Sequence, residues 1–385
     1  MNVSTLTKEA KETKEILKDI LHKDIVFPKL KKRKKKKVKK LILHKELVVF
    51  DIGSRYIKVV EGKVDIHGIK LKRAFLIDTP KDSVDDGSIL NKLSILKVIK
   101  ELTEEKGIKT NKVVFVNNST SIINRNISIP KIYDEDLRTL VTFEIQKFLP
   151  INMNDYIIQY YDPYENKGDT EKQNVLSIIY PYKMIKQYYE LCKEAKMIPV
   201  ALDVSFNSAK KLIEYSMSEI MEGRTIAAID IGYDDLYISI YDKGILKFTR
   251  IVRKGCKQID RYISEYRKVN MKEAEVIRSD IGLDYQELND DKEISEAITE
   301  YIETWVEEIN RIIQFYKNKN HGQGIEEIFI YGGGSMMTNV DRYLEDKLNI
   351  SVKKINKLPK VTLPKNHEDL KVELYLDAIG ALLRY

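Results

Sequence analysis

One pattern of apolar and polar positions occurs twice along this chain. Each copy starts with a short apolar run, which is typical of a buried strand, and continues as two alternating segments that predict a hairpin. The hairpin turns are marked by His67-Gly68 in the first copy and by Asp242-Lys243-Gly244 in the second. The predicted strands are residues 47–50, 56–65 and 69–78 in the first copy and residues 225–229, 237–241 and 245–252 in the second.

Segments with apolar residues three or four positions apart separate further short strands. The clearest predicts a long helix over residues 294–317, where a stripe of Ile, Trp and Tyr repeats throughout. This alternation of helices and strands predicts the α/β fold class. The other predicted helices are residues 89–107, 133–148, 184–196, 206–221, 257–268, 272–282, 339–348 and 375–384, and the other predicted strands are residues 113–116, 121–129, 156–161, 174–180 and 328–331.

Both copies of the repeated unit end their first strand in an acid and a glycine. The two triplets are Asp51-Ile52-Gly53 and Asp230-Ile231-Gly232, which lie 179 residues apart. A glycine lets the backbone of a turn approach a phosphate closely, and successive N–H groups there form an anion-binding concavity. The acid at the strand end can reach a divalent metal on the phosphates, usually through water. Two such hairpins predict a clamp around a phosphate tail.

A third glycine-rich segment follows the strand predicted over residues 328–331. Gly332, Gly333, Gly334 and Ser335 come directly after this strand and before a predicted helix. Such a loop lets the backbone and a helix N-terminus approach the ribose and α-phosphate of a nucleotide. The order of the three segments favours nucleotide binding more than any one of them does.

The length and composition of the chain exclude several classes of protein. A chain of 385 residues favours two lobes over one compact domain. No stretch approaches the roughly 20 apolar residues of a membrane helix, and the N-terminus lacks the apolar core of a secretion signal. Cys192 and Cys256 and the five scattered histidines have no metal-site spacing. We therefore expect free thiols in a reducing cytoplasm and no zinc site.

The first 45 residues form a basic extension that differs from the rest of the chain. They contain sixteen Lys/Arg and five Asp/Glu, a net charge of +11, so the remainder carries −4. Residues 6–21 have the spacing of a short amphipathic helix, and ten of the twelve residues from Lys29 to Lys40 are basic, which is typical of disorder in the unbound state. Three interpretations of this run stay open: a solvated tail, a contact with an anionic membrane surface or acidic protein, and nonspecific nucleic-acid binding. No specific nucleic-acid partner is expected.

The order of the three glycine-containing segments resembles the actin/sugar-kinase/chaperone ATPase superfamily. The resemblance implies a two-lobed actin-like fold, built on a ribonuclease-H-like repeat, that binds ATP and Mg²⁺. It divides the chain at residue 225: the first lobe covers residues 46–224, with a small α+β subdomain inserted at about residues 113–197. The second lobe covers residues 225–385, with a C-terminal helix at about residues 371–385 that returns to the first lobe.

The resemblance also assigns roles to individual residues. Asp51 and Asp230 would hold Mg²⁺ through water, and a lysine seven residues after Asp51, here Lys58, would reach the phosphates. Glu275 would face the ribose hydroxyls and Arg278 the base. The implied phosphate-binding residues are Asp51, Gly53, Ser54, Lys58, Asp230, Gly232, Tyr233 and Asp234, and the implied adenosine-binding residues are Glu275, Arg278, Gly332, Gly333, Gly334 and Ser335.

Within this superfamily the chain resembles the PilM family of type IV pilus assembly proteins. The likeness rests on Asp136-Leu137-Arg138, Phe143-Glu144 and Phe148-Leu149-Pro150-Ile151. It implies a cytoplasmic scaffold at the inner face of the cell membrane, in a type IV pilus or a related type II secretion system. Such a scaffold binds the cytoplasmic N-terminal segment of a PilN-like membrane protein through the inserted subdomain, and contacts assembly ATPases. Phe143, Phe148 and Tyr160 could line that groove or equally belong to the core.

Two departures from the superfamily pattern predict weak or absent ATP hydrolysis. Tyr233, Asp234 and Asp235 add bulk and negative charge where active members have small residues. No Gln or Glu stands where a water-positioning residue is expected, and Asp203 is only a weak catalytic candidate. ATP would then act as a structural ligand or a switch. Two alternatives stay open: a membrane-associated polymer subunit like the division protein FtsA, and a small-molecule kinase.

Overall fold

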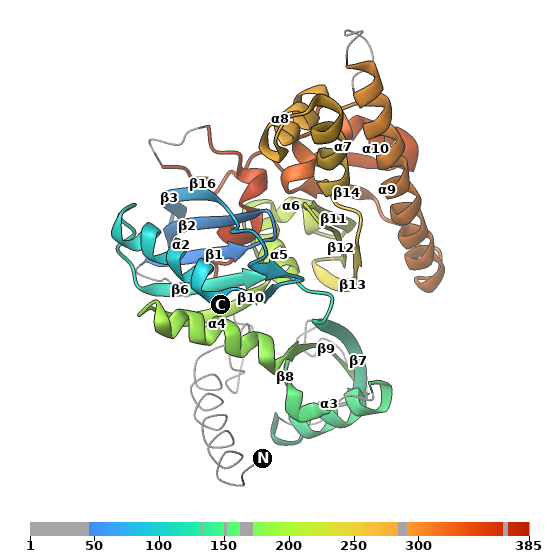
Figure 1. Cartoon of the computed structure of the whole chain (residues 1–385). Helices are drawn as coiled ribbons and strands as arrows, with labels where there is room; N and C mark the ends of the chain where they lie inside the picture. Colours follow the sequence, from blue (N-terminus) through green and yellow to red (C-terminus); the bar gives the residue numbers. More distant parts are fainter. Residues whose placement is uncertain are drawn as a thin grey trace. The chain divides into compact units, whose positions relative to one another are not determined.

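The computed structural model describes residues 46–131, 134–149, 152–161, 172–283, 291–364 and 369–384. The predicted basic extension, residues 1–45, lies outside the described residues. The chain forms two compact units, each described below by itself (Figure 1). The first unit consists of the residues up to Ala209 with Thr362–Asn366 and Asp377–Tyr385, and the second of Lys210–Val361 and His367–Leu376. Residues 210–224 thus belong to the second unit, and the C-terminal segment belongs to the first.

A six-stranded sheet is the centre of the first unit, in the order β10-β6-β1-β2-β3-β16. Strands β1, β6 and β10 are parallel, whereas β2 is antiparallel to β1 and to β3. All six residues of β1 are buried, which explains its continuous apolar run. The strands are β1 (Leu47–Ile52), β2 (Tyr56–Asp65), β3 (Gly68–Asp78), β6 (Lys112–Asn117), β10 (Ile198–Val204) and β16 (Val361–Thr362), and a separate small ladder joins β4 (Val84–Asp85) to β5 (Ser88–Ile89).

Helices α2 and α4 belong to the first unit, and helix α5 begins in it and crosses into the second unit. Helix α2 (Lys92–Glu104) begins at Asn91, whose side chain accepts a hydrogen bond from the Ser94 N–H at 3.2 Å. Helix α4 (Tyr182–Glu194) contacts α2 and β10, and its Tyr188 ring lies 5.4 Å from that of Phe115 on β6. Helix α5 (Ser205–Ser216) follows β10 directly.

A small α+β subdomain is inserted in the first unit between β6 and α4. Its antiparallel sheet has the order β7-β9-β8, and helix α3 lies against it. Seven fully buried aliphatic residues form its own core: Ile127, Ile129, Leu137, Val141, Ile145, Val175 and Ile179. The elements are β7 (Ile123–Pro130), α3 (Asp134–Phe148), the 3-10 turn η1 (Met153–Asp155), β8 (Tyr156–Tyr161) and β9 (Lys172–Pro181).

The second unit repeats the strand–hairpin pattern in a five-stranded sheet of order β13-β12-β11-β14-β15. Its core gathers around Trp305 of the long helix α9, whose predicted stripe is buried. The elements are α6 (Ser218–Met221), β11 (Thr225–Ile231), β12 (Leu236–Asp242), β13 (Ile245–Val252), α7 (Lys257–Arg267), α8 (Met271–Ile281), α9 (Lys292–Lys319), β14 (Glu327–Tyr331), η2 (Gly333–Met336), α10 (Val340–Leu348), β15 (Ser351–Lys354) and η3 (Val372–Leu374).

Two predicted helices were wrong in extent, and strand β10 was missed. The helix expected over residues 375–384 is only α11 (Leu376–Gly380). The Leu382 and Leu383 N–H groups that follow donate three residues back, to the Ile379 and Gly380 carbonyls, so the segment leaves the α-helical hydrogen-bond pattern. The helix over residues 206–221 is two helices that break at Met217. Strand β10 was not predicted; its run is short and contains Pro199, which disfavours a strand.

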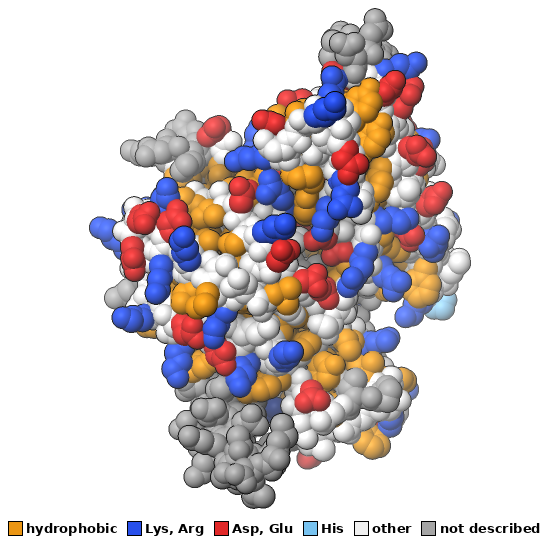
Figure 2. All heavy atoms as spheres, in the orientation of Figure 1, with side chains coloured by type: hydrophobic (Ala, Val, Ile, Leu, Met, Phe, Trp, Pro, Cys, Tyr) orange, Lys and Arg blue, Asp and Glu red, His pale blue; other side chains and the backbone are white. Residues whose placement is uncertain are grey.

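The visible surface of the described residues carries both positive and negative side chains. Figure 2 shows Lys and Arg side chains interspersed with Asp and Glu on one face. None of the helices in the described ranges has the length and apolar composition needed to cross a bilayer. Both cysteines are free, and both are buried.

Candidate functional site

The first predicted phosphate loop lies where β1 ends and β2 begins. Asp51 and Lys58 are direct cross-strand partners, and the Lys58 Nζ donates to Asp51 Oδ2 at 3.0 Å. The Asp51 residue is 5% exposed, so its carboxylate is held in place by β1 and by the lysine. The sequence predicted an acid and a lysine seven residues apart, and the antiparallel register explains why that spacing brings them together.

Gly53 forms the turn of this loop. Its N–H donates to the Tyr56 carbonyl at 3.1 Å, and its own carbonyl accepts from Thr79 Oγ1 at 2.7 Å. A Cβ at this position would stand 3.0 Å from the Tyr56 carbonyl and 3.9 Å from Lys58 Nζ. The glycine therefore keeps the space beside the lysine open to a phosphate, and the half-buried Ser54 follows in the same turn.

The second predicted loop, in the second unit, has the same backbone but different chemistry. The Gly232 N–H donates to the Asp235 carbonyl at 2.9 Å. Asp230 lies opposite Tyr237 on β12, where the first copy has Asp51 opposite Lys58. The repeat therefore preserves the acid and the glycine, but not the lysine.

The start of helix α7 fixes this second loop. The backbone N–H groups of Gly255, Cys256 and Lys257 donate to the carbonyls of Asp234, Gly232 and Tyr233 at 2.9, 3.1 and 2.9 Å, respectively. A Cβ at Gly255 would overlap the backbone of Tyr233, so only glycine fits there. Our sequence analysis missed Gly255, because its partner lies 22 residues earlier in the chain and no local pattern marks the contact.

Lys257 also changes the electrostatics expected of the second loop. Its Nζ donates to Asp234 Oδ1 at 3.0 Å and lies 5.8 Å from the centre of the Tyr233 ring. We expected the negative charge of Asp234 to repel a phosphate, but an adjacent ammonium group offsets it. The pair is partly exposed to solvent, so this compensation is incomplete.

The glycine-rich loop lies directly against the second loop, within the same unit. Gly332 has a φ of +83°, and a Cβ there would overlap the Asp230 carboxylate. A Cβ at Gly334 would overlap the Ile231 side chain and stand 2.7 Å from Cys256 Sγ. The buried Ser335 hydroxyl donates to the Gly332 carbonyl at 2.8 Å. A Cβ at Gly333 would meet nothing closer than the Leu374 side chain at 3.8 Å, so of these three glycines it is the one at which a ligand can approach the backbone.

Helix α8, which carries Glu275 and Arg278, is attached to this loop. The Thr338 N–H and hydroxyl both donate to the Ser279 carbonyl at 3.1 Å. Glu275 is partly exposed, whereas Arg278 is 1% exposed and its Nε donates to the buried Asp260 at 2.6 Å. Arg278 thus joins α8 to α7 behind the loop, and the predicted contact with a base stays a prediction.

Cys256 lies between α7, the glycine-rich loop and Arg278. Burial raises the pKa of its thiol to about 12; the nearby Arg278 guanidinium opposes this rise, and Asp260 adds to it. The thiol is therefore protonated at neutral pH and acts as a small packing group.

Asp203, the weak catalytic candidate, lies at the end of β10 in the first unit. One carboxylate oxygen accepts from Asn207 Nδ2 at 2.7 Å and the other from Arg384 Nη1 at 3.2 Å. Both oxygens are thus used by protein groups, and Asp203 is fully buried. This arrangement suits a structural carboxylate better than one that orients a water molecule.

Comparisons with known proteins agree with this architecture. The family described as Type IV pilus assembly protein PilM matches residues 49–384. A solved PilM-PilN type IV pilus biogenesis complex is similar with a TM-score of 0.75 and 20% identity, over 87% of this chain and 97% of that one. The ethanolamine utilization protein EutJ of Carboxydothermus hydrogenoformans is similar with a TM-score of 0.53 and 14% identity, over 98% and 99%. The predicted actin-like α/β fold class is confirmed.

Proposed function

We propose a scaffold function in pilus assembly for this chain, which belongs to the PilM family of type IV pilus assembly proteins. It would bind the cytoplasmic N-terminal segment of a PilN-like membrane protein at the inner face of the cell membrane, in a type IV pilus or a related type II secretion system. The observation that carries this proposal is the family match over nearly the whole described chain. The similar solved complex pairs a PilM protein with PilN.

The exposed face of α3 is the surface we assign to the partner segment. Phe143 and Phe148 are 55% and 69% exposed. The Lys147 Nζ lies 4.5 Å from the centre of the Phe143 ring and pairs with Glu144 at 2.7 Å. Exposed aromatic side chains are typical anchors for an apolar peptide. Tyr160 is half-buried and packs against the subdomain core.

ATP with Mg²⁺ is the ligand we assign to the glycine-containing loops. Mg²⁺ would neutralise phosphate charge and be held through water by Asp51 and Asp230; the described residues contain no cluster of three or more metal-binding side chains. Lys58 and the open turn at Gly53 suit phosphate oxygens, and Gly333 with the partly exposed Glu275 suits a ribose. These side chains and open glycine positions support the proposed nucleotide site.

Hydrolysis would be weak or absent. The Asp203 carboxylate is used by Asn207 and Arg384, and the second loop carries the bulky Tyr233. Phosphoryl transfer depends mainly on positioning, so a chain without a residue that orients water would release phosphate slowly. Nucleotide would then stabilise one arrangement of the protein and act as a structural ligand or switch.

Calorimetric titration with a synthetic PilN-type peptide tests the scaffold proposal. We expect binding that Phe143→Ala and Phe148→Ala each weaken about tenfold, the size of a typical interface anchor. Phe315→Ala is the matched control, because Phe315 is also a helical phenylalanine and is 50% exposed. Equal affinity in all variants would show that α3 is not part of the interface. If the parent protein does not bind the peptide, the scaffold function is contradicted.

A further inference from the structure

Strand β13 is the outermost strand of the five-stranded sheet in the second unit (Figure 1). Within the described residues it pairs with β12 on one side, and no strand of these residues lies on its other side. Leu246 and Val252 are its two buried residues, whereas the first six residues of β12 are all buried. The sheet therefore ends in an accessible strand to which a further strand can pair. We call residues 245–252 the β13 edge.

The C-terminal part of α9, residues 309–319, lies beside the β13 edge. The ring centres of Phe248 on β13 and Phe315 on α9 are 5.4 Å apart. Lys254, which follows β13, pairs with Glu308 of α9 at 3.4 Å. These two contacts join the strand and the helix into one continuous surface, and Phe315 is 50% exposed on it. A strand laid along the β13 edge would therefore bring the side chains of one of its faces to an exposed aromatic ring.

The sequence that forms this surface is strongly basic. Residues 243–254, which include the whole β13 edge, contain five Lys/Arg and no Asp/Glu. Residues 309–319 contain three Lys/Arg and no Asp/Glu. Asp242 and Glu308 pair with some of these cations and neutralise part of the charge. The surface keeps a positive excess, although residues 46–385 as a whole carry −4.

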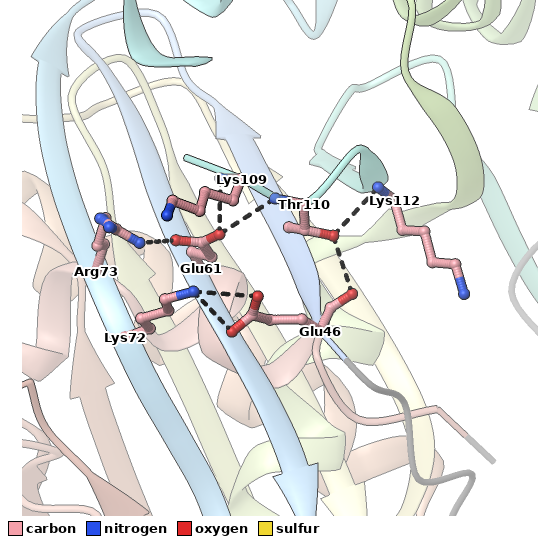
Figure 3. A network of polar contacts seen from close by, with 7 residues as sticks. All are labelled: Glu46, Glu61, Lys72, Arg73, Lys109, Thr110 and Lys112. Atoms are coloured by element: carbon pink, nitrogen blue, oxygen red, sulfur yellow. Dashed lines mark hydrogen bonds and ion pairs between the residues drawn. The ribbon is translucent and has the colours of Figure 1, made fainter. Parts of the chain in front are cut away.

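Arg250 is the cation of the β13 edge that is available to another molecule. It lies two residues after Phe248, so the two side chains are on the same face of the strand. Arg250 is exposed and has no ion-pair partner among the described residues. Figure 3 shows the opposite case in the first unit, where Arg73 on β3 pairs with the buried Glu61 at 2.5 Å. Arg73 is thus used inside the protein, whereas Arg250 can bind a carboxylate of a partner.

These features together fit an extended acidic peptide better than other anionic partners. A strand edge binds an extended chain through backbone hydrogen bonds, and the surrounding cations attract its carboxylates. A bilayer would leave the backbone groups of the edge without hydrogen-bond partners. The rings of Phe248 and Phe315 are inclined by 45°, so they do not form the flat platform on which nucleic-acid bases stack. Charges that only keep other strands away need no exposed phenylalanine beside them.

We propose that the β13 edge and residues 309–319 bind an extended, acidic segment of a partner protein, which pairs with β13 and continues the sheet. A carboxylate of the segment pairs with Arg250, and an apolar side chain packs on Phe315. This surface belongs to the second unit, whereas the α3 surface assigned to a PilN-like segment belongs to the first. The inference therefore goes beyond the proposed function, because it requires neither a PilN-like partner nor nucleotide.

Fluorescence anisotropy with the full-length protein tests the proposal. The probe is a labelled peptide in which glutamate alternates with valine and phenylalanine, and we expect saturable binding that weakens as salt rises. Arg250→Glu should weaken binding at least about tenfold, because it replaces an attraction by a repulsion. Phe315→Ala should weaken it about tenfold, the size of a typical anchor.

Lys112→Glu is the control for overall charge. Lys112 is also an exposed basic residue of a strand, in the first unit, and its side-chain amine makes none of the contacts drawn in Figure 3. The substitution changes the net charge as much as Arg250→Glu does, and should keep parental affinity. Equal weakening by the two substitutions would reduce the effect to overall charge and overturn the role of the β13 edge.

Strand pairing has a signature that a purely electrostatic contact lacks. Hydrogen exchange of the backbone amides in residues 245–252 should slow when the acidic peptide binds, and a peptide N-methylated at its four central residues should bind at least about tenfold more weakly. Binding without slower exchange would overturn the strand pairing.

Two further outcomes would overturn the proposal as a whole. These are no binding of the acidic peptide by the parent protein, and tighter binding of single-stranded DNA of the same length, which would assign the surface to nucleic acid. Phe143→Ala should leave the affinity for the acidic peptide unchanged. All these tests omit the PilN-type peptide, so their failure leaves the scaffold proposal untouched.

Discussion

Asp203 and Arg384 form a buried ion pair inside the first unit, 181 residues apart in sequence. Arg384 Nη1 donates to Asp203 Oδ2 at 3.2 Å, and the two side chains are 8% and 0% exposed. Asn207 on α5 donates to the other oxygen of the same carboxylate. Asp203 therefore joins three parts of the unit: the end of β10, the first turn of α5 and the C-terminal segment.

Removing one partner of this pair should destabilise the fold. Arg384→Ala leaves a buried carboxylate without its cation, and breaking a buried pair in this way costs about 3 kcal/mol. Urea unfolding should show that loss in the free energy of unfolding. Arg342→Ala is the control, since Arg342 is exposed on α10 and should change stability by less than about 0.5 kcal/mol. Similar small effects of both substitutions would show that the C-terminal segment is held by other contacts.

The elements that could be predicted from the sequence depend on local signals. The two hairpins follow from alternation and turn residues, and the Asp51–Lys58 pair follows from the antiparallel register around a short turn. The glycines of residues 332–334 follow strand β14 as expected. In each case a few neighbouring residues determine the geometry, so a single sequence is sufficient to predict it.

Contacts between distant segments could not be predicted. Strand β10 pairs in parallel with β6, 86 residues earlier, and its short run around Pro199 resembles a loop. The pairing of Lys257 with Asp234 depends on where α7 begins, which the sequence gives only approximately. The hydrogen bond of Arg278 to the buried Asp260 likewise depends on the packing of two helices.

The two acids of the repeated unit should both matter for nucleotide binding. We expect Asp51→Ala and Asp230→Ala each to weaken binding of Mg²⁺–ATP at least about tenfold, the loss of about 1.4 kcal/mol, while the protein stays folded. Isothermal titration measures the affinity, and circular dichroism checks the fold. Asp346→Ala, at an exposed position of α10, should leave the affinity unchanged. Parental affinity in both loop variants would contradict the assignment of these acids.

Gly332 allows the glycine-rich loop to lie against Asp230. Gly332→Ala should destabilise the second unit and reduce nucleotide affinity, because the added Cβ overlaps the Asp230 carboxylate and the φ of +83° strains any other residue. Gly322→Ala separates these two causes: its φ is +86°, but a Cβ there meets nothing within 4 Å. We expect a loss of about 1 kcal/mol from strain alone in Gly322→Ala, with unchanged nucleotide affinity. Equal effects of the two substitutions on affinity and stability would exclude steric overlap as the cause.

The buried thiol of Cys256 should make stability depend on pH in the alkaline range. Its pKa is about 12 in the folded protein, whereas an unfolded cysteine titrates near about 8.5. Between these values the unfolded chain releases a proton that the folded chain keeps, so the free energy of unfolding falls as pH rises. One such group contributes a slope of about 1.4 kcal/mol per pH unit.

Cys256→Ala removes this titrating group, and the slope rather than the absolute stability is the quantity to measure. Urea unfolding between about pH 8 and about pH 11 should show a shallower fall for the variant than for the parent, by the contribution of one proton. The substitution also removes a sulfur atom that packs beside Gly334, so the variant should be less stable at every pH. Parallel curves for the two proteins would mean that the thiol ionises in the folded state as readily as in water, and hence that α7 and the glycine-rich loop do not bury it.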